Sequence, residues 1–227
     1  HDTINRGLSV LNIKELEKIL LGISSYEISS LTGEVIHVDD KSVPGSVTKK
    51  EQQTKKINEK KQAIHTVNVS CSPMKYCLAS TKVLDKGGEK EVFKVFKDML
   101  DVLDLSGCLI TLDANFCCKD VPKAVKAHEG DFLIGLKENQ PKLLTAAEDL
   151  LEDTSITEAY LGEEEKGHGR IEKRACFVLN LSNLSAAQKE QYDTLFGEWD
   201  GLKSLIKIES TRTIKATKET TNETRYY

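Results

Sequence analysis

The order of strand-like and helix-like segments between residues 31 and 153 constrains the fold of this chain more than any other feature. Three strand patterns come first, a helix pattern follows, and strand and helix patterns then alternate. Consecutive strands favour an antiparallel meander, whereas a strand reached through a helix runs parallel to its neighbour. The expected strands are 33–40, 63–70, 75–83, 107–115 and 131–140, and the expected helices are 89–105, 119–130 and 141–153.

The periodicity of individual segments supports this order. Val92, Phe96, Met99 and Leu103 fall on one helical stripe, as expected for a helix that packs on a sheet. The segment "GCLITLDAN" is a continuous apolar run, which is typical of a central strand buried on both faces. The sequence therefore predicts an α/β fold with a ribonuclease-H-like mixed sheet, built from three antiparallel strands plus parallel strands with helices.

The pattern changes after residue 153, where segments rich in Thr, Glu and Arg are strand-like and one short helical piece, "SAAQKEQYDTLFGEW", interrupts them. We interpret this part as a β-rich lobe that follows the α/β core. The predicted domains are an N-terminal helical segment at 1–30, a ribonuclease-H-like catalytic core at 31–153 and the β-rich lobe at 154–227. The charged run at 49–61 is interpreted as a solvated loop.

Composition excludes some classes of protein. The net charge of −4 argues against a protein that coats nucleic acid through bulk charge, although it allows a local basic surface. No apolar stretch approaches the ~20 residues of a membrane span, so no membrane partner is expected. The six cysteines form no C-x-x-C pair, which argues against a zinc ribbon. The adjacent Cys117 and Cys118 would form a poor disulfide, so reduced thiols in a cytoplasmic protein are expected. The chain begins at His1 without an initiator methionine, which indicates a processed product or a fragment.

Aspartates end two of the expected strands. Asp39 and Asp40 end the first strand and Asp113 ends the fourth, and these two strands lie side by side in the ribonuclease-H-like order. Two like charges at one site resist joint ionisation unless a cation lies between them. Mg²⁺ or Mn²⁺ held by Asp39 and Asp113 is therefore favoured over a simple turn. Asp39 is preferred to Asp40 because adjacent strand residues face opposite ways.

An ordered series of motifs resembles one family nearly from end to end. The chain is similar to the ISAs-type (H-repeat-associated) DDE transposases of bacterial insertion sequences, and it matches them in "HDTINRGLS", "VIHVDDKS", "LDAN", "LKENQP", "GHGRIEKR", "WDGLKSLIKIES" and the terminal "RYY". The resemblance implies Mg²⁺-dependent DNA cleavage and strand transfer at insertion-sequence ends, with metal-ligand roles for Asp39 and Asp113. It also implies a homo-oligomer, since synapsis of two element ends requires multimers.

The resemblance also implies a third acid in the site. Glu172 in "GHGRIEKR" is the candidate catalytic residue, and the alternative is a strand whose basic residues face DNA or solvent. In related transposases with an inserted β-lobe, the last acid lies on a helix after that lobe. This chain ends at Tyr227, so the resemblance implies that the final core helix is missing.

Other polar residues are candidates for DNA contacts. Lys41, Lys137, Asn139 and Gln140 end strands at the expected active-site edge, where they could hold phosphate oxygens or form a polar turn. His168 and Arg170 accompany Glu172 in the β-rich lobe. These six residues are the predicted DNA-binding set.

Departures from the family pattern leave alternative functions open. Asp40 stands where the family has Gly, Pro44 stands where Arg is usual, and Phe116 and Cys118 replace polar residues after the second aspartate. The alternatives are a catalytically inactive or truncated transposase remnant that binds only DNA or a partner, and a metal nuclease without transposition. Joining of cleaved ends to target DNA would separate a transposase from a nuclease.

Overall fold

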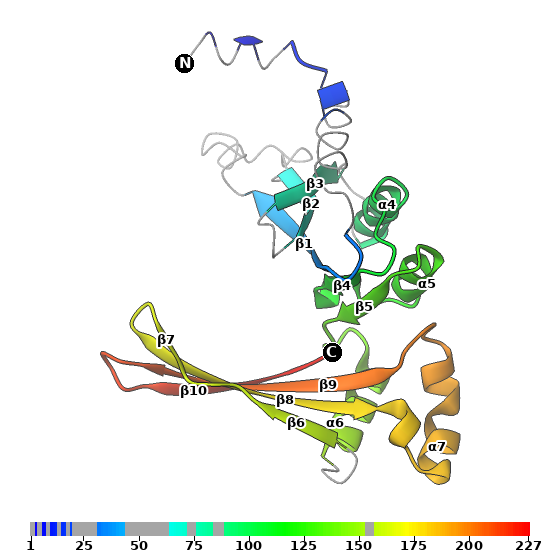
Figure 1. The fold of residues 1–227 in the computed structure, drawn as a ribbon, viewed down its shortest axis with the longest axis vertical. Helices are drawn as coiled ribbons and strands as arrows, with labels where there is room; N and C mark the ends of the chain where they lie inside the picture. The colour runs from blue at the N-terminus through cyan, green and yellow to red at the C-terminus, as the bar shows by residue number, and fades with distance from the viewer. Residues whose placement is uncertain are drawn as a thin grey trace, which may run out of the picture. The chain divides into compact units, whose positions relative to one another are not determined.

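The computed structural model describes residues 31–43, 64–71, 76–83, 89–152 and 157–227, together with single residues between 3 and 19 (Figure 1). The expected N-terminal helical segment lies largely outside the described residues, and the charged run at 49–61 and Pro44 lie wholly outside them. Figure 1 shows the described helices and strands with the labels used below.

A five-stranded mixed sheet in the order β3-β2-β1-β4-β5 forms the α/β part of the fold. β1 pairs antiparallel with β2, and β2 pairs antiparallel with β3. The bounds are β1 Val35–Val43, β2 Ile64–Cys71, β3 Tyr76–Val83, β4 Leu109–Leu112, β5 Asp131–Ile134, α4 Glu89–Leu100, α5 Asp120–Ala127 and α6 Pro141–Leu151. The expected α/β fold with a mixed sheet is confirmed, and its finer assignment as ribonuclease-H-like stays a prediction.

The first three strands bury one face and keep the other polar. Ile36 and Val38 of β1 are buried, as are Val67 and Val69 of β2. Helix α4 contacts β2 and β3, and it buries Val92, Phe96 and Met99 of the predicted stripe together with Leu100. The apolar residues at every second position of the strands thus pack against the apolar stripe of the helix, and together they form one core.

The second sheet is antiparallel and has the strand order β10-β9-β8-β6, with β7 paired to β8. The bounds are β6 Thr157–Leu161, β7 Glu165–Gly167, β8 Arg170–Asn180, β9 Ser204–Ile214, β10 Thr220–Tyr226 and α7 Ala186–Gly197. Helix α6 packs on β8 and β9, whereas β7 and the far ends of β8, β9 and β10 extend beyond it (Figure 1). We call this extension, residues 165–174 and 210–224, the arm.

Two compact units make up the chain: residues 1–111 with 127–131, and residues 112–126 with 132–227. The domain boundaries expected near 30 and 153 stay a prediction. Among the described residues, none of the helices is both long enough and apolar enough to cross a bilayer. All six cysteines are free, and Cys71, Cys108 and Cys117 are buried.

Two local predictions were wrong. The first strand does not end at Asp39 and Asp40 but continues to Val43, because Asp39 pairs with Asn68 and Lys41 pairs with Thr66 across the ladder with β2. Sheet pairing here overrides a local turn signal. The short strand β7 was also missed, and it joins β8 through a two-residue turn in which both His168 and Gly169 have positive φ angles, 46° and 76°.

Candidate active site and its surroundings

Asp39 lies on the polar face of β1. Its side chain is 50% exposed, and its carboxylate lies 3.0 Å from the Nζ atom of Lys41, two residues further along the same face. Asn68 lies directly opposite on β2, where its side-chain oxygen accepts a hydrogen bond from Ser80. A half-exposed carboxylate on a polar sheet face is accessible to a hard cation or to solvent.

Asp40 projects from the opposite, apolar face. Its side chain is only 11% exposed, and its Oδ2 atom lies 2.9 Å from Nε2 of His65. The contrast with Asp39 follows from the alternation of strand side chains, which is the reason for preferring Asp39 as a metal ligand. Asp40 is engaged in a contact inside the fold.

His37 contributes a further polar contact on the same face as Asp39. Its Nδ1 atom lies 2.7 Å from the hydroxyl oxygen of Thr111 on β4, 74 residues further along the chain. His37 precedes Asp39 by two residues, so both side chains belong to the polar face of β1.

Asp113 directly follows β4 and starts a single 3₁₀ turn, η2 (Ala114–Phe116). Its carboxylate is 50% exposed and lies 3.6 Å from the Nζ atom of Lys137. Gly135 approaches this turn closely, because a Cβ atom there would lie 3.1 Å from the backbone nitrogen of Ala114. A side chain at position 135 would push directly on the backbone that carries Asp113.

Asn139 and Gln140 bind the backbone that follows Asp113. The side-chain amide of Asn139 donates to the carbonyl of Ala114 at 2.8 Å, and that of Gln140 donates to the carbonyl of Cys117 at 2.8 Å. These contacts support the loop after Asp113, while the predicted phosphate-binding role of both amides stays a prediction. Burial raises the pKa of the Cys117 thiol to about 12, so this thiol is a poor nucleophile.

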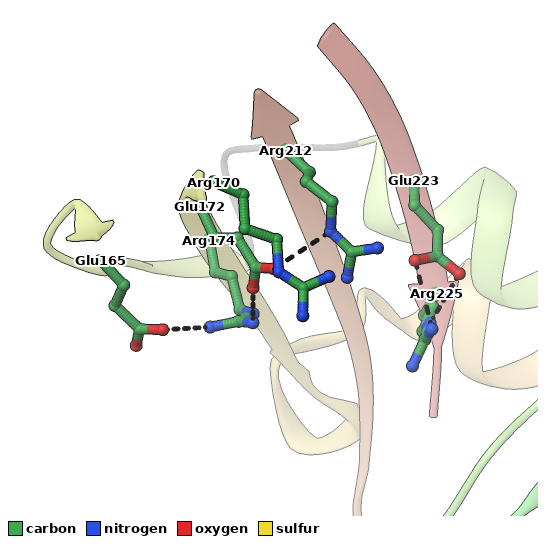
Figure 2. A network of polar contacts seen from close by, with 7 residues as sticks. All are labelled: Glu165, Arg170, Glu172, Arg174, Arg212, Glu223 and Arg225. Carbon is green, nitrogen blue, oxygen red and sulfur yellow. Dashed lines mark hydrogen bonds and ion pairs between the residues drawn. The ribbon is translucent and has the colours of Figure 1, made fainter. Parts of the chain in front are cut away.

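Glu172 lies on β8 of the second sheet among arginines (Figure 2). Its carboxylate lies 3.4 Å from Nε of Arg170 and 3.0 Å from Nε of Arg212, and it also accepts a hydrogen bond from Arg174. Arg174 in turn binds Glu165 of β7 at 2.9 Å. Each guanidinium competes with a metal ion for the oxygens of this carboxylate.

The predicted site residues thus fall into three neighbourhoods: Asp39 with Lys41, Asp113 with Lys137, and Glu172 with Arg170. His168 occupies the exposed turn between β7 and β8. Within the part of the chain that the structure describes, no group of three or more His, Cys, Asp or Glu side chains is arranged to hold a metal ion.

Sequence reasoning missed two members of the arginine group. Arg174 could have been found from the sequence, because every second residue of a strand lies on the same face, and residues 170, 172 and 174 therefore share one. Arg212 is 40 residues from Glu172 in sequence, and only the register of β8 with β9 brings them together.

Comparisons with known proteins place the chain among transposases. No protein-family model matches it. It is 32% identical over 231 residues to "Putative transposase YncI" of Escherichia coli O157:H7, covering 100% of this chain and 54% of that protein. It is 29% identical to "H repeat-associated putative transposase YhhI" of Escherichia coli K12, covering 100% of this chain and 57% of that protein. The chain thus spans little more than half the length of these relatives.

A shorter relative is covered more completely. The chain is 30% identical over 185 residues to "Putative transposase YncI" of Escherichia coli K12, which covers 80% of this chain and 70% of that protein. A solved structure of the piggyBac transposase synaptic complex with hairpin DNA matches with a TM-score of 0.36 and 13% identity, over 74% of this chain and 39% of that one. On the sequence relationships, the chain belongs to the family of H repeat-associated transposases.

Proposed function

We propose that this chain is the catalytic part of a DDE transposase, which cleaves DNA at insertion-sequence ends and joins those ends to target DNA. The observation that carries the proposal is a pair of half-exposed aspartates, Asp39 on β1 and Asp113 immediately after β4. These two strands are neighbours in the order of the five-stranded sheet. This is the strand order expected of a ribonuclease-H-like core, and membership of a transposase family supports the same function.

The residues at these positions fit a hard divalent cation. Carboxylate oxygens are the ligands that Mg²⁺ and Mn²⁺ prefer, and both carboxylates are open to solvent. A bound ion would activate water or a 3′-hydroxyl and stabilise the leaving oxygen. Asp39 and Asp113 would hold the ion, while the amino groups of Lys41 and Lys137 would attract the phosphate oxygens of DNA.

The third ligand is the open part of the proposed site. Glu172 stays a predicted third acid, but its contacts with three arginines disfavour a metal role. A carboxylate from outside the described residues is the alternative. The variant Glu172→Gln separates the two, because only a ligand changes the affinity of the site for metal.

The alternative function is an inactive remnant that binds DNA or a partner, and the region around Asp40 favours it. The family has Gly at this position, whereas here an aspartate is held against His65 beside the proposed ligand Asp39. Such a substitution changes the strand that carries the site.

Metal binding is the direct test of the proposed site. At a Mn²⁺ concentration about ten times Kd, we expect a gain of ~1.4 kcal/mol in unfolding free energy and a rise of a few degrees in Tm. Asp39→Asn and Asp113→Asn should each remove most of that rise. Asp40→Asn is the control and should keep it, whatever its own effect on stability. An equal rise in wild type and in both of the first two variants would contradict the two-aspartate site.

DNA chemistry is the test of the reaction. The substrate is duplex DNA carrying the sequences that flank the coding region, mixed with Mg²⁺ and plasmid target. We expect cleavage and joining in the wild type, and a loss on the order of a hundredfold or more in Asp39→Asn and Asp113→Asn. Cleavage without joining would support the nuclease alternative, and binding without cleavage would support the remnant.

A further inference from the structure

Four arginines and two glutamates share one face of the second sheet at the arm and next to it. Arg170, Glu172 and Arg174 alternate along β8, so their side chains leave the same face. Arg212 lies opposite Glu172 on β9. On β10, Glu223 and Arg225 continue the face, and Glu223 accepts hydrogen bonds from both Nε and Nη2 of Arg225. Figure 2 shows these side chains together.

Glu172 fixes the direction of two of these guanidinium groups. It binds Arg170 and Arg212 through their Nε atoms. The terminal Nη atoms of both arginines point away from Glu172 in Figure 2, and the structure gives them no partner among the described residues. A guanidinium held at Nε by a carboxylate presents its two Nη groups as a preorganised pair of donors. Planar donor pairs of this kind match phosphate oxygens.

A shallow cavity lies beside this cluster. Its volume is about 130 Å³, well above the ~10–15 Å³ that one ordered water requires. Arg174, Arg212 and Arg225 contribute to its wall, together with the hydroxyl-bearing Ser210 and Thr221. The wall is therefore rich in hydrogen-bond donors, and Glu172 and Glu223 on the same wall already bind arginines.

The cluster continues toward Asp113 within the same compact unit. The backbone nitrogen of Leu136 donates to the carbonyl of Tyr226 at 2.8 Å, which ties the end of β10 to the segment that carries Lys137. Hydrogen bonding by Arg225 lowers the pKa of Glu223, and the charges of Arg212 and Lys137 lower it further. Lys137 is the residue that lies 3.6 Å from Asp113. Positive charge thus extends from the arm to the proposed catalytic aspartate.

We propose that Arg170, Arg174, Arg212 and Arg225 bind the phosphate backbone of DNA and that Glu172 is the positioning residue that orients Arg170, Arg174 and Arg212. The choice of DNA as the source of the phosphates rests on the proposed function, while the anion-binding site rests on the cluster itself. In this proposal Glu172 orients arginine side chains toward the DNA backbone and does not bind metal.

The first test measures affinity for a fluorescent duplex of about 20 base pairs by anisotropy, in EDTA, at salt concentrations between about 50 and 200 mM. We expect Arg212→Gln to weaken binding on the order of tenfold and to reduce the salt slope by about 0.9 for each phosphate that the protein no longer neutralises. Lys173→Gln removes the same charge from the opposite face of β8 and is the matched control. Equal effects of the two substitutions would overturn the site.

The second test isolates the positioning role. Glu172→Gln removes a negative charge, so simple electrostatics predicts tighter DNA binding, whereas loss of orientation predicts binding weakened several-fold. Glu219→Gln removes an exposed negative charge at the turn after β9, and we expect it to leave binding unchanged or slightly tighter. Tighter binding by Glu172→Gln would overturn the positioning role. Arg212→Lys keeps the positive charge but lacks the planar pair of guanidinium donors, so it should also weaken binding. This variant tests the same point if Glu172→Gln fails to fold.

Two further measurements separate this proposal from the proposed catalysis. Asp113→Asn should lose cleavage yet still bind the duplex in EDTA at least as tightly as wild type, because the arginine site needs no metal and the substitution removes a negative charge. Inorganic phosphate should compete with the duplex in wild type and compete more weakly in Arg212→Gln. Stabilisation by phosphate without any affinity for DNA would overturn DNA as the ligand.

Discussion

The first three strands and the arm are both antiparallel, but they are held in different ways. β1 and β2 bury Ile36, Val38, Val67 and Val69 against one core, whereas the arm carries arginine–glutamate pairs on one exposed face. Apolar burial stabilises in proportion to area and tolerates little change of shape. Exposed ion pairs contribute little stability and are screened by salt.

This difference indicates which residues of the second sheet are available for function. Side chains that contribute little to stability and yet are held in a defined orientation are free to bind a ligand. Substitutions in the first region should therefore lower the free energy of unfolding, whereas substitutions in the arm should change affinity for DNA. The following predictions test this contrast, beginning with the most severe substitution.

Phe96→Ala should be the most damaging of these changes. Phe96 on α4 is 0% exposed, and its truncation leaves a cavity that costs about 3–5 kcal/mol of unfolding free energy. Urea denaturation followed by circular dichroism measures the change. Val102→Ala, at a residue 62% exposed, is the control and should change stability by less than about 0.5 kcal/mol. A loss below about 1 kcal/mol for Phe96→Ala would contradict the assignment of the core.

Asn139→Ala should have an intermediate effect, because it removes the hydrogen bond that supports the loop after Asp113. We expect a loss of about 1 kcal/mol together with weaker Mn²⁺ stabilisation, since Asp113 loses support for its position. The neighbouring change Glu138→Ala at an exposed residue serves as the comparison. If Mn²⁺ stabilises Asn139→Ala as much as the wild type, the hydrogen bond of Asn139 does not contribute to the position of Asp113.

Glu172→Gln should change stability by about 1 kcal/mol, because the Glu172 side chain is 17% exposed but its arginine partners are 42% to 49% exposed and remain largely solvated. Urea denaturation of this variant beside Phe96→Ala compares the two regions directly. A loss near that of Phe96→Ala would show that the arm is held by its charges as firmly as the core is held by burial.

The smallest effect should be a pH dependence at Glu223. Its pKa is lowered below the ordinary 4.5, first by hydrogen bonding with Arg225, so its contribution to stability is present above pH 4.5 and is lost as pH falls through the folded-state pKa. The Tm difference between wild type and Glu223→Gln should therefore shrink between about pH 6 and about pH 3. High salt should also shrink it, because both side chains are exposed. A difference independent of pH and salt would contradict a charge origin.

Periodicity predicted most of the regular structure. The four-residue apolar run of β4 and the stripe of α4 are local signals, and both elements form where their patterns occur. The end of β1 could not be predicted locally, because Asp39, Asp40 and Lys41 are turn-type residues that remain in the strand only through pairing with β2.

The candidate site was only partly accessible from sequence. Strand position identified Asp39 and Asp113 as candidate carboxylates. The contact of Asp39 with Lys41 follows from their spacing of two residues on one strand, whereas the contact of Asp113 with Lys137 depends on the fold. The surroundings of Glu172 depend on the register of β8 with β9, which no local pattern specifies. Similarly, the bonds of Asn139 and Gln140 to backbone carbonyls depend on how a later loop returns to the turn after Asp113.

The contact between Asp40 and His65 couples two positions that lie 25 residues apart in sequence. A carboxylate that is 11% exposed on an apolar face is costly to bury without hydrogen-bond donors, and Nε2 of His65 lies 2.9 Å from its Oδ2 atom. The two positions therefore form an epistatic pair, in which the double substitution should cost less than the sum of the two single substitutions.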